Sequence, residues 1–575
     1  MAEGESQLTG FGKLISVLLI LGLIGGGVYL FTNANRPAPQ PGPSGGSTTG
    51  GGSAAPLVED VDLTGVTTVK EYKYVPAQRL KPVEGISGYK WDDKEKVLRF
   101  SYNVWAGWLP VIAANRGTKP NAESVFFKKH GFKVELVLMD EPDIARTAFV
   151  QGEVHTLWGT VDMMTLFAPS LMRDSRTAPR IVQQIDWSNG GDGIVVRKSI
   201  QSVKDLKGKS VTLAQNSPSQ YYLTSLLLSA GLKPADVKVK YTATAFEAAR
   251  AFVEDKSVDA CVSWAPDIYN IADRVPGTRI LSSTADANKL IADVYAVRAD
   301  FAKDHPEIVE GLVAGIFEGM DFVKKHPEEA CKWMADAFGL KFEEAMGMRG
   351  DAHSTNFAEN EQFFLNASNP TNFERTWKNA SFVYRELGQI DAPVPFDDVM
   401  DFSIIKKLKE AGTFKDHKDE SVSTFTPANV SKLQLEAPIL TQTIRINFFP
   451  NSANPYELAR DPYGNVLQGK LYDPGVDATL EQVARLAGQF DRATVLVKGH
   501  TDSSMKGKAP YEAVKQLSQD RAQAVKQALV TKFKFDPNKF VIEGCAWDVP
   551  FSETDPNNHA LNRRVEISVY QPEQK

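Results

Sequence analysis

A histidine and an aspartate stand two positions apart near the carboxyl end of the chain, in the stretch VKGHTDSS at 497–504. His500 and Asp502 are residue types found in hydrolase triads, in zinc sites and in binding loops without chemistry of their own. A triad needs a serine activated by a base, and nothing marks the neighbouring serines as activated. Zinc would need more ligands, and this region offers only His559 and Cys545 at no recognisable spacing. The pattern favours binding over catalysis, so we expect a protein that is not an enzyme and holds no metal or cofactor.

Three further candidate sites lie in the middle of the chain, where predicted strands run into turns. They are VWAGWLP at 104–110, LAQNSPSQYY at 213–222 and CVSWAPD at 261–267. From about 97 to 390, short apolar runs alternate with helical patterns, which predicts an α/β fold with a mostly parallel sheet. Ligands bind at strand ends in such folds, so the three stretches together predict one shared cleft.

The second stretch also carries the signals of a helix start. Ser217 is a good N-cap, Pro218 suits the first helical position, and Gln220 completes a capping box. The free backbone N–H groups within 218–221, together with the helix dipole, would form a cradle for an anion.

The length, charge and cysteine content of the whole chain limit the number of domains and the classes of function. A chain of 575 residues predicts two to four domains. Its net charge of -6, without a basic run interleaved with aromatics, argues against nucleic-acid binding. Three widely separated cysteines indicate neither a disulfide framework nor a metal motif.

The amino-terminal part predicts attachment to a membrane. Residues 14–31 are uncharged and apolar, and as a helix they would span ~27 Å, near the lower limit for a bilayer. A cleaved signal peptide is the alternative, but no clear cleavage site follows. The segment 32–56 is rich in Pro, Gly and Ser and is typical of a flexible tether.

The middle region resembles periplasmic substrate-binding proteins of the nitrate, sulfonate and taurine transporter class. The resemblance rests on DLKGKSVTLAQNSPSQYYLTSLLLSAGL at 205–232, VDACVSWAPD at 258–267 and the segment 294–340. It implies a two-lobed periplasmic-binding-protein fold (type II) that closes on a small anionic solute. A pyrimidine synthase of thiamine biosynthesis resembles the same proteins, but its cysteine cluster has no counterpart here. By position, the implied ligand-binding residues are Trp105, Trp108, Asp162, Ser217, Ser219, Gln220, Tyr221, Trp264 and Asp267.

The carboxyl-terminal region resembles the OmpA-like peptidoglycan-binding domain, an α+β fold. Four stretches in the right order carry the resemblance: GHTD, LSQDRAQAV, GCAWDVP and NRRVEI. It implies that Asp502 and Arg521 hold diaminopimelate of the peptidoglycan stem peptide. A carboxylate can take its ammonium group, and a guanidinium can take its carboxylate in bidentate fashion. Asn562 and Arg564 would lie beside this site, although strand structure explains them about as well.

Together these interpretations predict a single-pass inner-membrane protein with most of its chain in the periplasm. The alternatives are a structural envelope tether whose middle domain has lost its ligand, and a motor-stator-like protein, which would need an acid inside its span. Expected partners are peptidoglycan, a small anionic solute, and a transporter permease or another inner-membrane protein. The expected divisions are a tail at 1–13, a transmembrane helix at 14–31, a linker at 32–56, a lead-in segment at 57–95, a binding domain at 96–411, a linker at 412–437 and an OmpA-like domain at 438–575.

Overall fold

The computed structural model describes residues 65–427, 430–433, 438–449 and 451–570. The predicted transmembrane helix at 14–31 and the linker at 32–56 lie outside these residues. Within the described ranges, no helix combines the length and the apolar character needed to cross a membrane.

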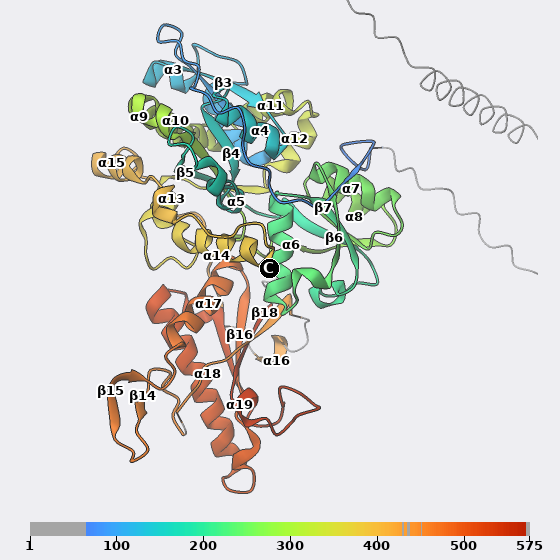
Figure 1. The fold of residues 1–575 in the computed structure, drawn as a ribbon, viewed down its shortest axis with the longest axis vertical. Helices are drawn as coiled ribbons and strands as arrows, with labels where there is room; N and C mark the ends of the chain where they lie inside the picture. The colour runs from blue at the N-terminus through green and yellow to red at the C-terminus, as the bar shows by residue number, and fades with distance from the viewer. Residues whose placement is uncertain (1–64, 428–429, 434–437, 450, 571–575) are drawn as a thin grey trace, which may run out of the picture. The chain divides into compact units, whose positions relative to one another are not determined.

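The first lobe is built on a six-stranded sheet in the order β12-β5-β11-β4-β2-β3 (Figure 1). Alternating apolar residues such as Leu98 and Phe100 of β2 are fully buried beneath the helices. The strands are β2 (Val97–Tyr102), β3 (Lys133–Leu138), β4 (Thr156–Thr160), β5 (Pro179–Ser188), β11 (Ala292–Arg298) and β12 (Ala352–Ser354). The helices are α2 (Leu109–Asn115), α3 (Val125–His130), α4 (Pro142–Val150), α5 (Val161–Leu171), α9 (Ala299–Asp304), α10 (Pro306–Lys325), α11 (Pro327–Phe338), α12 (Phe342–Met348), α13 (Phe357–Leu365), α14 (Phe373–Glu386) and α15 (Ser403–Ala411).

The second lobe has its own six-stranded sheet, in the order β1-β8-β7-β9-β6-β10. Helix α7 packs against β7 and β9, and α8 packs against β6 and β10. The strands are β1 (Tyr74–Val75), β6 (Asp192–Arg197), β7 (Ser210–Ala214), β8 (Lys238–Thr242), β9 (Ala260–Trp264) and β10 (Thr278–Ser283). The helices are α6 (Pro218–Ser229), α7 (Ala245–Glu254) and α8 (Asp267–Arg274).

Both sheets are mixed, so the prediction of a mostly parallel sheet is wrong. Strand β2 runs parallel to β3 and β4, and β7 runs parallel to β8 and β9. Strands β6 and β11 run antiparallel to their neighbours. The reason is that β6 and β11 each begin at a connection between the lobes. They run away from that boundary, whereas β2, β4, β7 and β9 end at it.

Two short connections join the lobes, at 189–191 and 284–291, and hydrogen bonds hold them together. The Thr284 hydroxyl accepts from the backbone N–H of Gly190 at 2.9 Å and of Asp192 at 3.2 Å. The Ser188 hydroxyl donates to the Asp192 carboxylate at 2.6 Å. The start of β6 is therefore tied to the end of β10 at the hinge.

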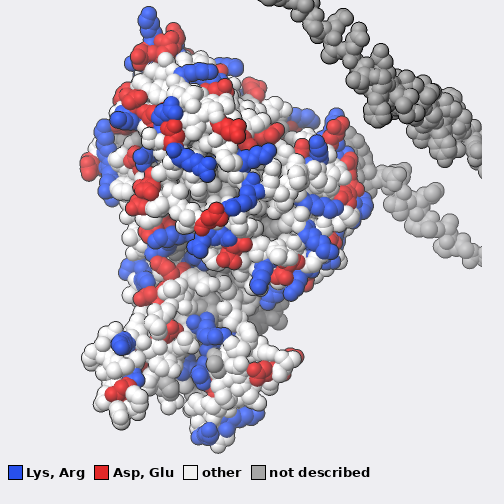
Figure 2. Space-filling model, in the orientation of Figure 1, with Lys and Arg blue, Asp and Glu red and all other residues white. Residues whose placement is uncertain are grey.

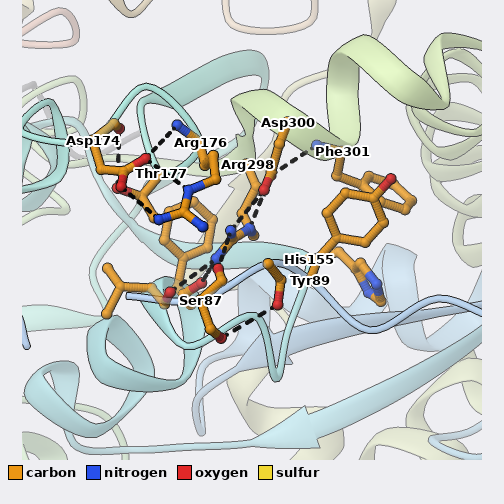
Figure 3. Close-up of polar contacts among 12 residues, drawn as sticks. Ser87, Tyr89, His155, Asp174, Arg176, Thr177, Arg298, Asp300 and Phe301 are labelled. Carbon is orange, nitrogen blue, oxygen red and sulfur yellow. Dashed lines mark hydrogen bonds and ion pairs between the residues drawn. The ribbon is translucent and has the colours of Figure 1, made fainter. Parts of the chain in front are cut away.

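The lead-in segment contacts both lobes. Its β1 pairs with β8 of the second lobe. Further along, the carbonyl of Ser87 accepts a 2.8 Å hydrogen bond from the Arg298 guanidinium in the first lobe (Figure 3). Arg298 is fully buried, donates also to the carbonyls of Phe149 and Val150, and pairs with Asp300 at 2.7 Å. One buried cation thus satisfies three backbone carbonyls from two segments of the chain.

Replacing Arg298 with Met should lower the free energy of unfolding of the first lobe by about 3 kcal/mol, because buried carbonyls and a carboxylate lose their donor. Arg176→Met is the matched control. Arg176 pairs with Asp174 in the same view, but its side chain is 46% exposed. An exposed pair of this kind contributes about 0–1 kcal/mol. Urea unfolding followed by tryptophan fluorescence measures both, and equal effects would contradict this account.

The carboxyl-terminal region forms a separate four-stranded sheet in the order β13-β18-β16-β17. Strands β16 and β17 are parallel and joined through α18, which packs on both, so the predicted strand–helix–strand unit is confirmed (Figure 1). The strands are β13 (Leu440–Ile444), β14 (Leu458–Arg460), β15 (Val466–Leu471), β16 (Thr494–Gly499), β17 (Phe540–Gly544) and β18 (Val565–Tyr570). The helices are α16 (Val430–Leu433), α17 (Val476–Gln489), α18 (Tyr511–Phe533) and α19 (His559–Asn562).

Gly499 explains how β16 and α18 come close enough to share a site. A Cβ at this position would lie 2.0 Å from the carbonyl oxygen of Ser518 in α18, so a larger residue would force the helix away. The glycine of GHTD therefore sets the distance between the end of β16, which leads to Asp502, and the helix that carries Arg521.

Candidate functional site

A small cavity of about 20 Å³, room for roughly one water molecule, lies between the two lobes and is partly open to solvent. Its walls come from the ends of β2, β4 and β9, the starts of β6 and β11, and the first turn of α6. The strand directions described above bring these ends together. The lining residues are Asn103, Trp105, Trp158, Asp192, Pro218, Trp264, Ile291 and Asp293.

Two of the nine residues predicted for this cleft, Trp105 and Trp264, line the cavity. The ring N–H of Trp105 reaches the Asp186 carboxylate at 3.3 Å. This approach depends on Gly107, because a Cβ there would lie 1.7 Å from an Asp186 oxygen and 2.6 Å from the Trp105 nitrogen. The glycine of WAGW thus makes room for the contact between the first tryptophan and β5.

The other predicted residues do not line the cavity and are buried in contacts of their own. Trp108 is fully buried and donates to Asn103 at 2.7 Å. Asp162 accepts from Tyr384 at 3.0 Å, and Tyr221 accepts from Asn379 at 2.7 Å. Asp267, at the start of α8, accepts from the backbone and hydroxyl of Thr68, at 2.9 and 2.6 Å.

The start of α6 differs in detail from its predicted form. Ser217 occupies the N-cap position and Pro218 the first turn, as predicted. The predicted capping box is wrong, because the Ser217 hydroxyl donates to the carbonyl of Ala214, and Gln220 accepts from the backbone of Asn216. Ser219 is buried, and its hydroxyl has no hydrogen-bond partner among the described residues.

Buried carboxyl groups dominate the electrostatics of the cavity. The pKa of Asp192 is raised to about 7, mainly by burial; the Ser188 hydroxyl lowers it in part, and the charges of Asp162 and Asp351 add to the rise. Burial also raises the pKa of Asp293 well above its ordinary value, with Asp186 as the next contributor. Asp186 and Asp293 face each other across β5 and β11 and share a hydrogen bond, which requires that one of them keeps its proton.

These shifts predict an unusual pH dependence of stability. Unfolded Asp192 loses its proton near its ordinary pKa of about 4, whereas the folded protein keeps it up to about pH 7. The unfolded state therefore binds fewer protons in this window, and the free energy of unfolding falls as pH rises from about 4 to 7. Asp192→Asn should flatten this fall and raise the melting temperature at pH 7.5.

The control for this measurement is Asp174→Asn, because hydrogen bonds from Arg176 hold the pKa of Asp174 at about 2. This carboxylate is already ionised throughout the window, so its loss should leave the slope between pH 4 and 7 unchanged. Melting temperatures that rise from pH 4 to 7 in the wild type, with no effect of Asp192→Asn, would contradict the assignment.

A second cavity lies in the carboxyl-terminal region and holds both residues predicted to bind peptidoglycan. Asp502 and Arg521 line it together, and its volume is about 240 Å³, part of it open to solvent. Both side chains are buried. The other lining residues are Phe448, Asn451, Tyr472, Thr501, Ser504, Met505, Leu517 and Arg563.

The two charged groups stay ionised in different ways. Burial by itself raises the pKa of Asp502, but hydrogen bonds from Ser504 and Arg563 bring it below its ordinary value. The Asp502 carboxylate pairs with Arg563 at 2.6 Å and lies 3.3 Å from His559. Burial lowers the pKa of Arg521 to about 10, which leaves it charged at neutral pH. The cavity therefore offers a carboxylate and a guanidinium to one ligand.

Asn562 and Arg564 do not line this cavity. Asn562 accepts from the backbone of Phe551 at 2.8 Å and donates to the carbonyl of Pro556 at 2.7 Å. Arg564 pairs with Glu566 at 2.7 Å on the same strand. Both are buried and hold the loop before β18 in place.

Sequence reasoning missed several lining residues at both sites. Arg563 stands next to Arg564, and neighbouring residues of an extended chain point to opposite sides, so a comparison of the two arginines could have found it. Trp158 lies within β4, a strand that the sequence analysis did not predict. Asp192 and Asp293 lie at the starts of strands, whereas the three stretches predicted to form the cleft lie at strand ends.

Comparisons with known proteins agree with this architecture. Residues 121–330 match a family described as "NMT1/THI5 like", and residues 470–564 match the OmpA family. The chain thus joins an NMT1/THI5-like domain to an OmpA domain, and the predicted fusion is confirmed.

Curated relatives cover the two regions separately. A Brucella abortus (strain 2308) protein whose name describes it only as a binding protein is 25% identical over 231 residues, 40% of this chain and 66% of its own length. The taurine-binding periplasmic protein of Escherichia coli K12 is 27% identical over 222 residues, 37% of this chain and 66% of its own. Outer membrane protein Omp38 of Acinetobacter baumannii is 33% identical over 91 residues, 16% of this chain and 24% of its own.

Solved structures include the periplasmic aliphatic sulphonate-binding protein of Escherichia coli. It is 20% identical with a TM-score of 0.41, and the match covers 52% of this chain and 96% of that one. A desulfurization enzyme is also similar, at 16% identity and a TM-score of 0.39, covering 55% of this chain and 99% of that one.

Proposed function

We propose that this chain is a non-catalytic solute-binding protein of the bacterial cell envelope that attaches to peptidoglycan through its carboxyl-terminal domain. The observation that carries the proposal is the presence of two separate ligand cavities in one chain. One lies between two hinged lobes, and the other holds a buried carboxylate and a buried guanidinium in the region that matches the OmpA family.

The proposal includes attachment to the inner membrane through residues 14–31, with the bulk of the chain in the periplasm. Such a protein would hold its solute cavity between membrane and wall, where it could supply a transporter permease or report occupancy to another inner-membrane protein. The visible face agrees with a part of the chain that is exposed to water. On the face shown in Figure 2, Lys and Arg are interspersed with Asp and Glu rather than gathered in one patch.

For the wall site we expect that Asp502→Ala and Arg521→Ala each abolish retention on purified peptidoglycan in a sedimentation assay. The carboxylate would take the ammonium of the stem-peptide diamino acid, and the guanidinium would take its carboxylate. Arg521→Lys should weaken retention as well, because a point charge cannot replace the bidentate fork.

Asp520→Ala is the matched control, since Asp520 neighbours Arg521 on α18 but is exposed and outside the cavity. It should leave retention unchanged. Retention that survives in both Asp502→Ala and Arg521→Ala, with folded protein, would overturn the assignment of these two residues.

A second candidate function is a structural tether whose middle domain no longer binds a solute. The small volume of the interlobe cavity favours it, because about 20 Å³ is far below the ~300–1,000 Å³ of ligand pockets.

To separate the two functions, full-length protein would be purified without dialysis and denatured, and the released small molecules identified by mass spectrometry. Solute binding predicts one compound in roughly stoichiometric amount. Gly191→Leu is the control, because even a Cβ at this position would lie 2.4 Å from the Trp105 ring that lines the cavity. If the wild-type protein releases no small molecule and also binds no added solute, the structural-tether function is supported.

A further inference from the structure

The ionisable groups at the cavity between the lobes are all acidic. Asp192 and Asp293 line it, and Asp186 lies beside Asp293 on the neighbouring strand. Of the described residues that line it, none is Lys, Arg or His. Within the described part of the chain, no ion pair joins any of these three carboxylates to a basic side chain. Buried carboxylates are costly unless a positive charge compensates them.

The tryptophans supply the second feature. The ring N–H of Trp105 is directed to Asp186, and that of Trp158 donates to the carbonyl of Met139 at 2.9 Å. With these N–H groups engaged, both side chains have only ring surface to offer a ligand. Aromatic faces beside carboxylates are the arrangement that attracts ammonium and quaternary ammonium groups.

Trp264 supplies a third and independent sign of a ligand. It lines the same cavity and is only 7% exposed, yet its ring N–H has no hydrogen-bond partner among the described residues. Indole N–H groups are usually satisfied when buried. This donor is therefore available to an acceptor atom on a bound solute.

We propose that the solute bound between the lobes carries a positively charged ammonium or quaternary ammonium group, which Asp192 and Asp293 neutralise and the rings of Trp105 and Trp158 contact. This proposal rests on the solute-binding function above and names the chemistry of its ligand. In this conformation the cavity has a volume of about 20 Å³, room for roughly one water molecule, so a solute binds only after the lobes move apart. The prediction of an anionic solute, made from the sequence, is the competing hypothesis.

The start of α6 is the one feature here that favours an anion. A helix N-terminus carries roughly half a positive charge, and Pro218 at this start contributes no N–H. Two lining carboxyl groups, each able to carry a full negative charge, outweigh it. The helix end and the Trp264 N–H are then suited to a hydroxyl or acidic group elsewhere on the same solute. A zwitterion such as taurine fits this arrangement if its ammonium group lies against Asp192 and Asp293.

The test is isothermal titration of the detergent-solubilised full-length protein with five probes. Tetramethylammonium, choline and taurine carry the cationic group, methanesulfonate carries only an anionic one, and Mg²⁺ is a cation without apolar surface. We expect at least one ammonium compound to bind, while methanesulfonate and Mg²⁺ do not. Asp293→Asn should weaken that binding by about tenfold or more.

Asp267→Asn is the matched control, because Asp267 is equally buried but contacts Thr68 outside the cavity. It should leave the affinity unchanged. Binding of methanesulfonate without any ammonium compound would overturn the cation proposal and leave solute binding intact. Binding of Mg²⁺ alone would overturn it in favour of a metal. No binding by any probe would also overturn it, and solute binding would then be decided by the released-solute experiment.

Discussion

The structure of the binding region depends on how three aspartates are placed between its lobes without a basic partner among the described residues. Each lies on a strand next to the hinge: Asp186 near the end of β5, Asp192 at the start of β6 and Asp293 at the start of β11. Burial of these groups costs folding free energy, which the surrounding apolar packing must offset. Such destabilising groups are most often found in binding clefts, where a bound ligand lowers the free-energy cost of burying them.

The hinge and the cleft share residues. The Ser188 and Thr284 hydroxyls that join the two connections also bond to Asp192, so closure of the lobes and the position of this carboxylate are coupled. Two glycines serve the same site, because Gly107 and Gly191 leave the space that the Trp105 side chain occupies. The lead-in segment adds a further constraint, since it contacts both lobes across the hinge.

Much of this could be predicted from the sequence, and the limits have physical reasons. The α/β alternation, the helix start at Ser217 and the strand–helix–strand unit around Asp502 and Arg521 are local patterns, and the structure contains them. The mixed sheets could not be read locally, because the direction of β6 and β11 depends on the chain crossing between lobes. For the same reason Asp192 and Asp293 escaped notice. A pattern of residue types does not reveal which strands begin at a cleft.

The central claim is that uncompensated carboxyl groups define the cleft, and infrared spectroscopy of the unliganded protein at pH 7 tests it most directly. Protonated carboxyl groups absorb at a different infrared frequency from carboxylates. We expect a protonated-carboxyl band in the wild type that is reduced in the Asp186→Asn, Asp293→Asn double variant and weakens when an ammonium ligand binds. A wild-type spectrum at pH 7 without that band would contradict it.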